Sequence, residues 1–178
     1  MDPLISTNPS NGKIIKSYHQ ISDQELNDKI NKSFNSQISW KETSIQFRLD
    51  RVRDLSEVLM DKKREYSVLM AEEMGKPIKQ GEAEIEKCIF LCKYFIQNTE
   101  SYLQDKIVQI DGQKSFVSIQ PIGLVLGIMP WNFPFWQVFR FAIPSVIVGN
   151  GAILKHASNV QGCGLAMEAS FLEAGFPD

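Results

Sequence analysis

LVLGIMPWNFP at residues 124–134 decides the fold class of this 178-residue chain. Its first six residues form an unbroken apolar run, which predicts a strand of a parallel sheet covered on both faces. A helical pattern follows from Pro134 to Val148, a second apolar strand surrounds residues 152–154, and a further helix is expected from about Asn159 to Ala174. This strand-helix-strand-helix order predicts an α/β fold that contains the first units of a doubly wound parallel sheet.

Helical patterns dominate the sequence before this region. Ser22 and Glu25 form a capping-box sequence, and apolar residues at positions 26, 30 and 34 then share one face, so a first helix is expected there. Helical spacing resumes at Thr43 and stops at about Met74, where Gly75-Lys76-Pro77 follows. The residues between these points predict one broken helix or two.

A third helical stretch and a hairpin lie between residues 78 and 119. Ile78 to Leu103 has helical spacing, and the position of Glu82, Glu84 and Glu86 near its start is explained by the helix dipole. Two runs of strand-forming residues then flank Asp111-Gly112, which predicts a β-hairpin. Because two buried parallel strands do not make a stable sheet by themselves, further strands are expected beyond Asp178 or from another polypeptide.

Composition narrows the classes of partner. Lys and Arg total 19 against 21 Asp and Glu, the net charge is −2, and no dense basic run occurs, so nucleic acid is an unexpected partner. The apolar stretches are far shorter than the roughly 20 residues that cross a bilayer, and no secretion signal is visible, so a cytoplasmic protein is expected. No metal site is expected, because the only histidines are His19 and His156 and the thiols of Cys88, Cys92 and Cys163 fit core packing.

The segment PWNFP, Pro130 to Pro134, directly follows the first parallel strand and resembles the signature of the aldehyde dehydrogenase superfamily. The resemblance extends to EEMGKPIKQGEAE at residues 72–84, to Gly149-Asn150-Gly151 and to EAGFP at residues 173–177. Residues 129–164 look most like bacterial succinate-semialdehyde dehydrogenases. The resemblance covers essentially the whole chain.

The resemblance implies an architecture. Residues 1–104 would be the N-terminal helical part of the cofactor-binding domain, 105–120 an oligomerisation β-hairpin, and 121–178 the start of its Rossmann-like sheet, with the catalytic domain absent from this chain. Homodimers or homotetramers are the expected assemblies of the intact enzyme. The implied chemistry is attack of a cysteine thiolate on the aldehyde, hydride transfer to a nicotinamide and hydrolysis of the thioester.

Asn132 is the catalytic residue that the resemblance assigns to this chain. Each intermediate carries negative charge on oxygen, and a neutral amide aimed at that oxygen stabilises the charge. An alternative is that Asn132 only caps the helix that opens near Pro134. The resemblance places the nucleophilic cysteine and the general-base glutamate beyond Asp178, so the isolated chain is expected to be inactive.

The same resemblance implies that NADP or NAD binds at the carboxyl ends of the two strands. Lys155 would contact the adenosine ribose, although an exposed lysine at a strand end needs no ligand to explain it. Ser158 stands where many NAD-preferring relatives have a glutamate, so repulsion of a 2′-phosphate is relieved and NADP should be accepted. His156 could add positive charge, but a lone histidine is more often a packing or surface residue. The residues assigned to the cofactor are Ile128, Met129, Pro130, Trp131, Asn132, Lys155, His156, Ala157 and Ser158.

Arg140 is the residue assigned to substrate selection. It follows Asn132 by about two helical turns, and its planar guanidinium suits the carboxylate of a carboxylated aldehyde such as succinic semialdehyde, with Phe133 and Trp136 as channel walls. The alternative is an arginine that faces solvent or bridges acidic groups. Rival functions are a dehydrogenase of another aldehyde and a truncated, non-catalytic remnant that acts as an assembly module. A general helical binding protein would leave PWNFP unexplained.

Overall fold

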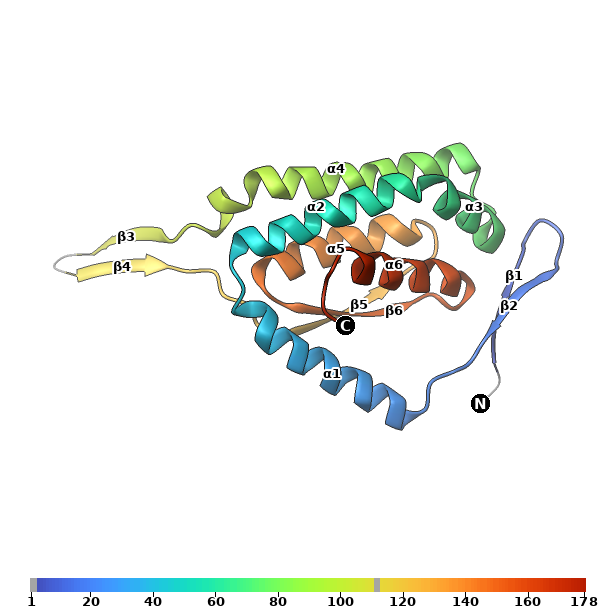
Figure 1. Ribbon diagram of the computed structural model, residues 1–178, viewed down its shortest axis with the longest axis horizontal. Coiled ribbons are helices and arrows are strands. Elements are labelled where there is room, and N and C mark those ends of the chain that lie inside the picture. The colour runs from blue at the N-terminus through green and yellow to red at the C-terminus, as the bar shows by residue number, and fades with distance from the viewer. Residues whose placement is uncertain (1–2, 111–112) are drawn as a thin grey trace.

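The computed structural model describes residues 3–110 and 113–178 as a mixed α/β structure. Figure 1 shows a layer of helices above a pair of parallel strands, with a hairpin projecting from one end. The elements are, in chain order, β1 (Leu4–Thr7), β2 (Ile14–Tyr18), α1 (Asp23–Lys41), α2 (Ile45–Asp61), α3 (Lys63–Met74), α4 (Ile78–Leu103), β3 (Lys106–Ile110), β4 (Gln113–Val117), β5 (Leu124–Met129), α5 (Pro134–Val148), β6 (Gly151–His156), the short 3-10 helix η1 (Ser158–Val160) and α6 (Gln161–Glu173).

The expected helices are confirmed, and their ends have local causes. Ser22 and Glu25 form the predicted capping box, in which the Glu25 carboxylate accepts from the Ser22 N–H at 2.7 Å. The stretch after Thr43 is two helices that meet at Lys62. Helix α3 ends at Gly75, whose φ of 73° is a left-handed conformation that favours glycine.

Strands β5 and β6 are parallel and adjacent, as the sequence predicts, with Leu124 opposite Gly151 and Met129 opposite His156. Helix α5 packs closely on one face: a Cβ at Gly127 would lie 2.5 Å from the Phe141 ring. The expectation that β5 is covered on both faces is wrong for the described residues, because Leu126 is 59% exposed and Ile128 is 70% exposed. Alternate side chains of a strand point to opposite faces, and α5 covers only one of them.

The core lies mainly among helices α2 to α6, which contribute most of its buried apolar side chains, and it includes the three cysteines. Cys88, Cys92 and Cys163 are unpaired and fully buried, which confirms that they pack in the core. Burial raises the pKa of the Cys92 thiol to about 12 and raises the pKa of the other two thiols as well. At neutral pH all three are therefore protonated thiols and poor nucleophiles.

The predicted hairpin is also present, as the antiparallel pair β3–β4 with Ile107 opposite Phe116. Its expected turn, Asp111-Gly112, lies outside the described residues. Figure 1 shows that β3 and β4 extend away from the helices. Apolar side chains on both of its faces are exposed, among them Ile107 at 72%, Phe116 at 54% and Val117 at 57%.

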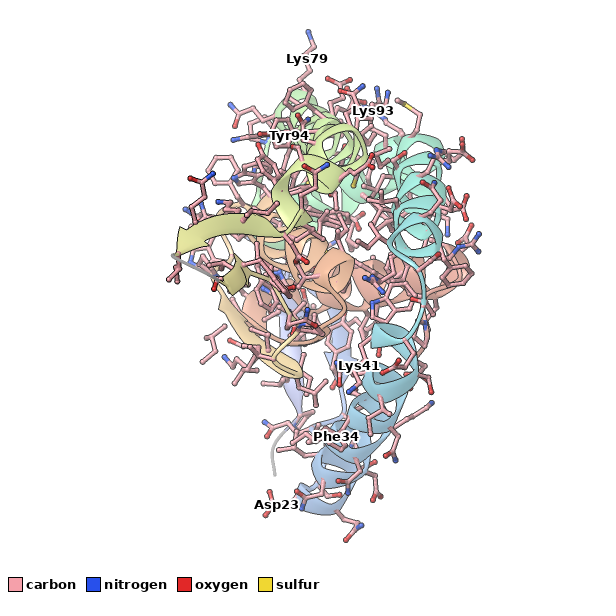
Figure 2. The ribbon with its side chains drawn as sticks, turned by 90° about the vertical axis from the view of Figure 1, so that its left-hand side faces the viewer. Asp23, Phe34, Lys41, Lys79, Lys93 and Tyr94 are labelled. Carbon is pink, nitrogen blue, oxygen red and sulfur yellow. The ribbon has the colours of Figure 1, made fainter. Side chains whose placement is uncertain are left out.

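The two buried residues of helix α1, Gln37 and Trp40, lie in its C-terminal turns. The Gln37 amide donates to the Gly149 carbonyl at 2.9 Å, and the Trp40 indole donates to the Val146 carbonyl at 2.8 Å. Figure 2 shows the helix extending from Lys41 past Phe34 to Asp23, away from the helical layer. The predicted apolar face is exposed, with Phe34 at 51%.

Candidate functional site

The carboxyl ends of β5 and β6 bring the two groups of predicted site residues together. Ile128 pairs with Lys155 and Met129 with His156, so the segments that follow the two strands leave the same sheet edge. Parallel strands of open α/β sheets bind ligands at this edge. Trp131 and Phe133 are half exposed there, at 50% and 46%, and Asn132 and Ser158 are exposed.

The side chain of Asn132 is held at its oxygen only. Its Oδ1 accepts from the backbone N–H of Phe133 at 3.1 Å. Within residues 3–110 and 113–178, no hydrogen bond engages its Nδ2. The amide therefore presents a donor without a protein acceptor at the exposed end of β5.

Glu84, a residue of α4, caps helix α5. Its Oε1 accepts from the backbone N–H groups of Phe135 and Trp136, at 2.9 Å each, and the glutamate is 4% exposed. Helix α5 has no hydrogen-bonded side-chain cap from its own N-cap residue, Phe133. The first free N–H groups of α5 are therefore satisfied from α4, and the alternative that Asn132 caps this helix does not describe the structure.

Lys76 completes a buried cluster beneath the Asn132 segment. Its ammonium forms an ion pair with Glu84, donates to the Asn132 carbonyl at 3.0 Å and lies 4.0 Å from the centre of the Phe133 ring. Both charged residues are buried, Lys76 at 6% exposure. Sequence reasoning missed this pair. A usable signal was the spacing of four residues that puts Glu84 on the same face of a helix as Cys88. In the structure, Glu82 and Glu86 instead form ion pairs at the surface.

Glu73 caps the start of helix α6, as Glu84 caps the start of α5. Its carboxylate accepts from the N–H groups of Gly162 and Cys163, at 2.8 and 2.9 Å, and from the Ser6 hydroxyl at 2.9 Å. The β1–β2 pair, which the sequence did not predict, is thus tied to the start of α6. Because buried glutamates already take N–H groups at the starts of both α5 and α6, those groups are not free to bind a phosphate.

His156 is buried and joins the two segments of the sheet edge. Its Nδ1 accepts from the Ala157 N–H at 2.8 Å, which leaves Nε2 as the donor to the Pro134 carbonyl at 3.1 Å. Burial lowers the pKa of this imidazole, so it is neutral at pH 7. The structure thus favours packing over the expected positive charge. Lys155 is exposed and makes no ion pair with any described residue.

The predicted substrate residues lie along the outer face of α5. Trp136 and Arg140 are one helical turn apart, and Phe133 immediately precedes the helix. Trp136 is half-buried, with the Lys87 ammonium 3.9 Å from its ring centre. Arg140 is exposed and forms no ion pair within the described part of the chain, so its guanidinium is available to an anion.

Among the described residues, no group of three His, Cys, Asp or Glu side chains is arranged to hold a metal ion. None of the helices described is both long and apolar enough to cross a membrane.

Comparison with known sequences gives matches over the whole chain. A model described as the aldehyde dehydrogenase family matches residues 2–178. A probable succinate-semialdehyde dehydrogenase, NADP(+), of Synechocystis sp. is 39% identical over 98% of this chain and 38% of its own length. The succinate semialdehyde dehydrogenase Sad, NAD(P)+, of Escherichia coli is 34% identical over 97% of the chain and 37% of its own. The chain thus spans less than two fifths of these relatives.

Solved structures of the same kind match the fold. The structure described as giving insights into cofactor and substrate selection by Gox0499 superposes with a TM-score of 0.96 at 29% identity, over 99% of this chain and 39% of that one. Succinic semialdehyde dehydrogenase from Streptococcus pyogenes, in complex with NADP+, gives a TM-score of 0.91 at 24% identity, over 98% of this chain and 38% of that one. The second likeness concerns the fold alone.

Proposed function

This chain belongs to the aldehyde dehydrogenase family, and from that premise we propose an activity for the complete enzyme. That enzyme oxidises succinic semialdehyde, or a similar small carboxylated aldehyde, to its acid with NADP or NAD. By complete enzyme we mean an active protein of the relatives' length that carries residues 1–178. A hybrid with the remaining part of the Synechocystis relative is one such protein. The names of the relatives support the substrate class and the cofactor.

The observation that carries the proposal is the unengaged amide nitrogen of Asn132. In the proposed reaction a cysteine thiolate, supplied by the remainder of the enzyme, attacks the aldehyde carbon, and the carbonyl oxygen becomes an oxyanion. An amide donor fixed in advance stabilises that charge without reorganising during the step. Loss of a hydride from this adduct to bound NADP or NAD would give a thioester, from which water would release the acid. Among the described residues, Asn132 is thus the group that we assign to the reacting oxygen.

The edge of β5 and β6 suits the cofactor. Exposed Ile128 and Trp131 offer backbone and apolar surface, and the free ammonium of Lys155 can donate to a ribose hydroxyl. The exposed Ser158 hydroxyl lies where a carboxylate would repel a 2′-phosphate. When bound, the nicotinamide supplies the acceptor for the hydride. We place NADP or NAD on this edge by these features, with Ala157 and His156 shaping the backbone beneath it.

Ser158→Glu should shift the complete enzyme from NADP toward NAD. A carboxylate within about 4 Å of the 2′-phosphate costs roughly 1 to 4 kcal/mol, so the ratio of kcat/KM for NADP to that for NAD should fall at least about fivefold. Steady-state kinetics with both cofactors gives this ratio. Ser158→Gln introduces a side chain of nearly the same size as glutamate but without its charge, and it should change this ratio far less. An unchanged ratio in the glutamate variant would show that Ser158 does not face the cofactor.

The β3–β4 hairpin supports a second proposal, that the complete enzyme assembles into homodimers or homotetramers through it. Its exposed apolar residues lie on both faces of a two-stranded ribbon, and such a ribbon is marginally stable without further packing. A second copy of the chain would bury this surface. An exposed apolar patch of this kind commonly marks a protein interface.

Ile107→Asp should weaken that assembly. Burying a carboxylate at an apolar contact is unfavourable, and about 1.4 kcal/mol already raises the dissociation constant tenfold. Sedimentation velocity across a range of protein concentrations measures the change. Phe90→Asp, at an apolar residue of α4 that is 69% exposed, is the matched control and should leave the assembly intact. Equal dissociation constants for the native and Ile107→Asp proteins would remove the hairpin from the interface.

A further inference from the structure

We propose that the buried ion pair of Lys76 and Glu84 sets the direction of the Asn132 amide. The two are positioning residues, since both are buried beneath the Asn132 segment and act through it. This inference rests on the proposed function, because it concerns how the oxyanion donor is held. It derives from contacts between α4, the loop that joins α3 to α4, and the segment that joins β5 to α5.

Glu84 determines which group caps helix α5. The helix begins with Pro134, and its next two N–H groups, of Phe135 and Trp136, both donate to Glu84 Oε1. Asparagine is among the residues that most readily accept such N–H groups at a helix start. With Glu84 in place these donors are taken, and Asn132 is free to keep its amide at the exposed edge.

Lys76 fixes the peptide plane to which that amide is bound. Its ammonium holds the carbonyl of Asn132, and the N–H of the same peptide unit, which belongs to Phe133, donates to Asn132 Oδ1. The lysine also packs against the Phe133 ring. Lys76 holds the oxygen of this peptide unit, and the N–H of the same unit holds Oδ1 of the Asn132 side chain. The direction of Nδ2 therefore follows from the position of Lys76.

Glu73 shows that capping by a buried glutamate does not by itself require a lysine. It accepts N–H groups at the start of α6, and its side-chain partners include the hydroxyls of Ser6 and Tyr18. At α5 the glutamate is joined by Lys76, whose ammonium also contacts residues 132 and 133. The added charge pair therefore serves the Asn132 segment and not helix capping in general.

A double-mutant cycle between Glu84→Gln and Asn132→Ala in the complete enzyme tests this inference. Glutamine keeps the size of the side chain but removes the charge that holds Lys76. The rate of the first turnover is measured from the formation of NADPH. We expect this rate to fall about tenfold in Glu84→Gln, while KM for the aldehyde stays within about twofold of native. In the Asn132→Ala background the same change should cost less than about twofold.

Glu73→Gln is the matched control. It removes an equally buried helix-capping carboxylate, so its melting temperature should fall by a similar amount, but its first-turnover rate should stay within about twofold of native. Equal rate losses in the two glutamine variants would overturn the inference, as would equal effects of Glu84→Gln in the native and Asn132→Ala backgrounds.

Lys76 variants keep the test decisive if Glu84→Gln does not fold. Lys76→Arg retains the charge and a donor for the Asn132 carbonyl, so it should keep more of the rate than Lys76→Gln at saturating aldehyde. Equal rates for these two variants would contradict the positioning role. Failure of the proposed function has a different signature: Asn132→Ala alone would then leave the rate near native.

Discussion

Asn132→Ala is expected to lower kcat of the complete enzyme by about 10²- to 10³-fold, the usual cost of removing one oxyanion donor. The amide nitrogen of Asn132 has no acceptor among the described residues, and Glu84 already caps α5. Removing the side chain therefore leaves the helix capped and takes away the donor, together with the Oδ1 that accepts from the Phe133 N–H. First-turnover kinetics measures the acylation step, and KM for the aldehyde should change much less than kcat.

Asn150→Ala is the appropriate control for that experiment. Asn150 also uses its amide oxygen on the backbone, accepting from the N–H groups of Ile122 and Gly123 at 2.7 and 3.0 Å, but it lies at the amino-terminal end of the same strand pair. Its loss should lower stability with little change in kcat. If Asn132→Ala costs less than about fivefold in the acylation step, the amide does not bind the oxyanion.

Arg140→Leu is expected to change substrate preference by at least about tenfold. The guanidinium is exposed on the outer face of α5, on the same side as Trp136, and no described carboxylate neutralises it. Its planar fork can bind both oxygens of the substrate carboxylate in a bidentate pair. The value of kcat/KM for succinic semialdehyde should fall at least about tenfold, while that for an uncharged aldehyde of similar length should hold or rise.

Arg64→Leu controls for the loss of an exposed arginine. Arg64 lies on α3, and its guanidinium pairs with Glu82 at 2.8 Å. It is not among the residues of the sheet edge or of α5, so kcat/KM should change little, and equally for both substrates. Parallel losses on the two aldehydes in Arg140→Leu would show that this arginine supports the structure and does not select a carboxylate.

Local patterns were sufficient for most of the fold. The capping box at Ser22, the apolar run of β5 and the spacing along α4 each depend on residues within a turn or two of one another, and each element forms where its pattern predicts. The β1–β2 pair was not predicted because its strands are short. It is also held by a contact that no local pattern indicates: the Ser6 hydroxyl in β1 donates to Glu73, 67 residues away.

The sequence by itself also determined which residues gather at the site, since parallel neighbouring strands must end at the same edge of a sheet. Only the tertiary structure decided how they are held. On a helix, Glu84 looks like one more acid favoured by the dipole, and Lys76 looks like part of a helix stop. Their partners at Asn132 and Phe135 are 51 to 56 residues away, and no periodic pattern in the sequence indicates such a contact. Burial makes these contacts decisive, because a charge removed from water must find its partner inside the protein.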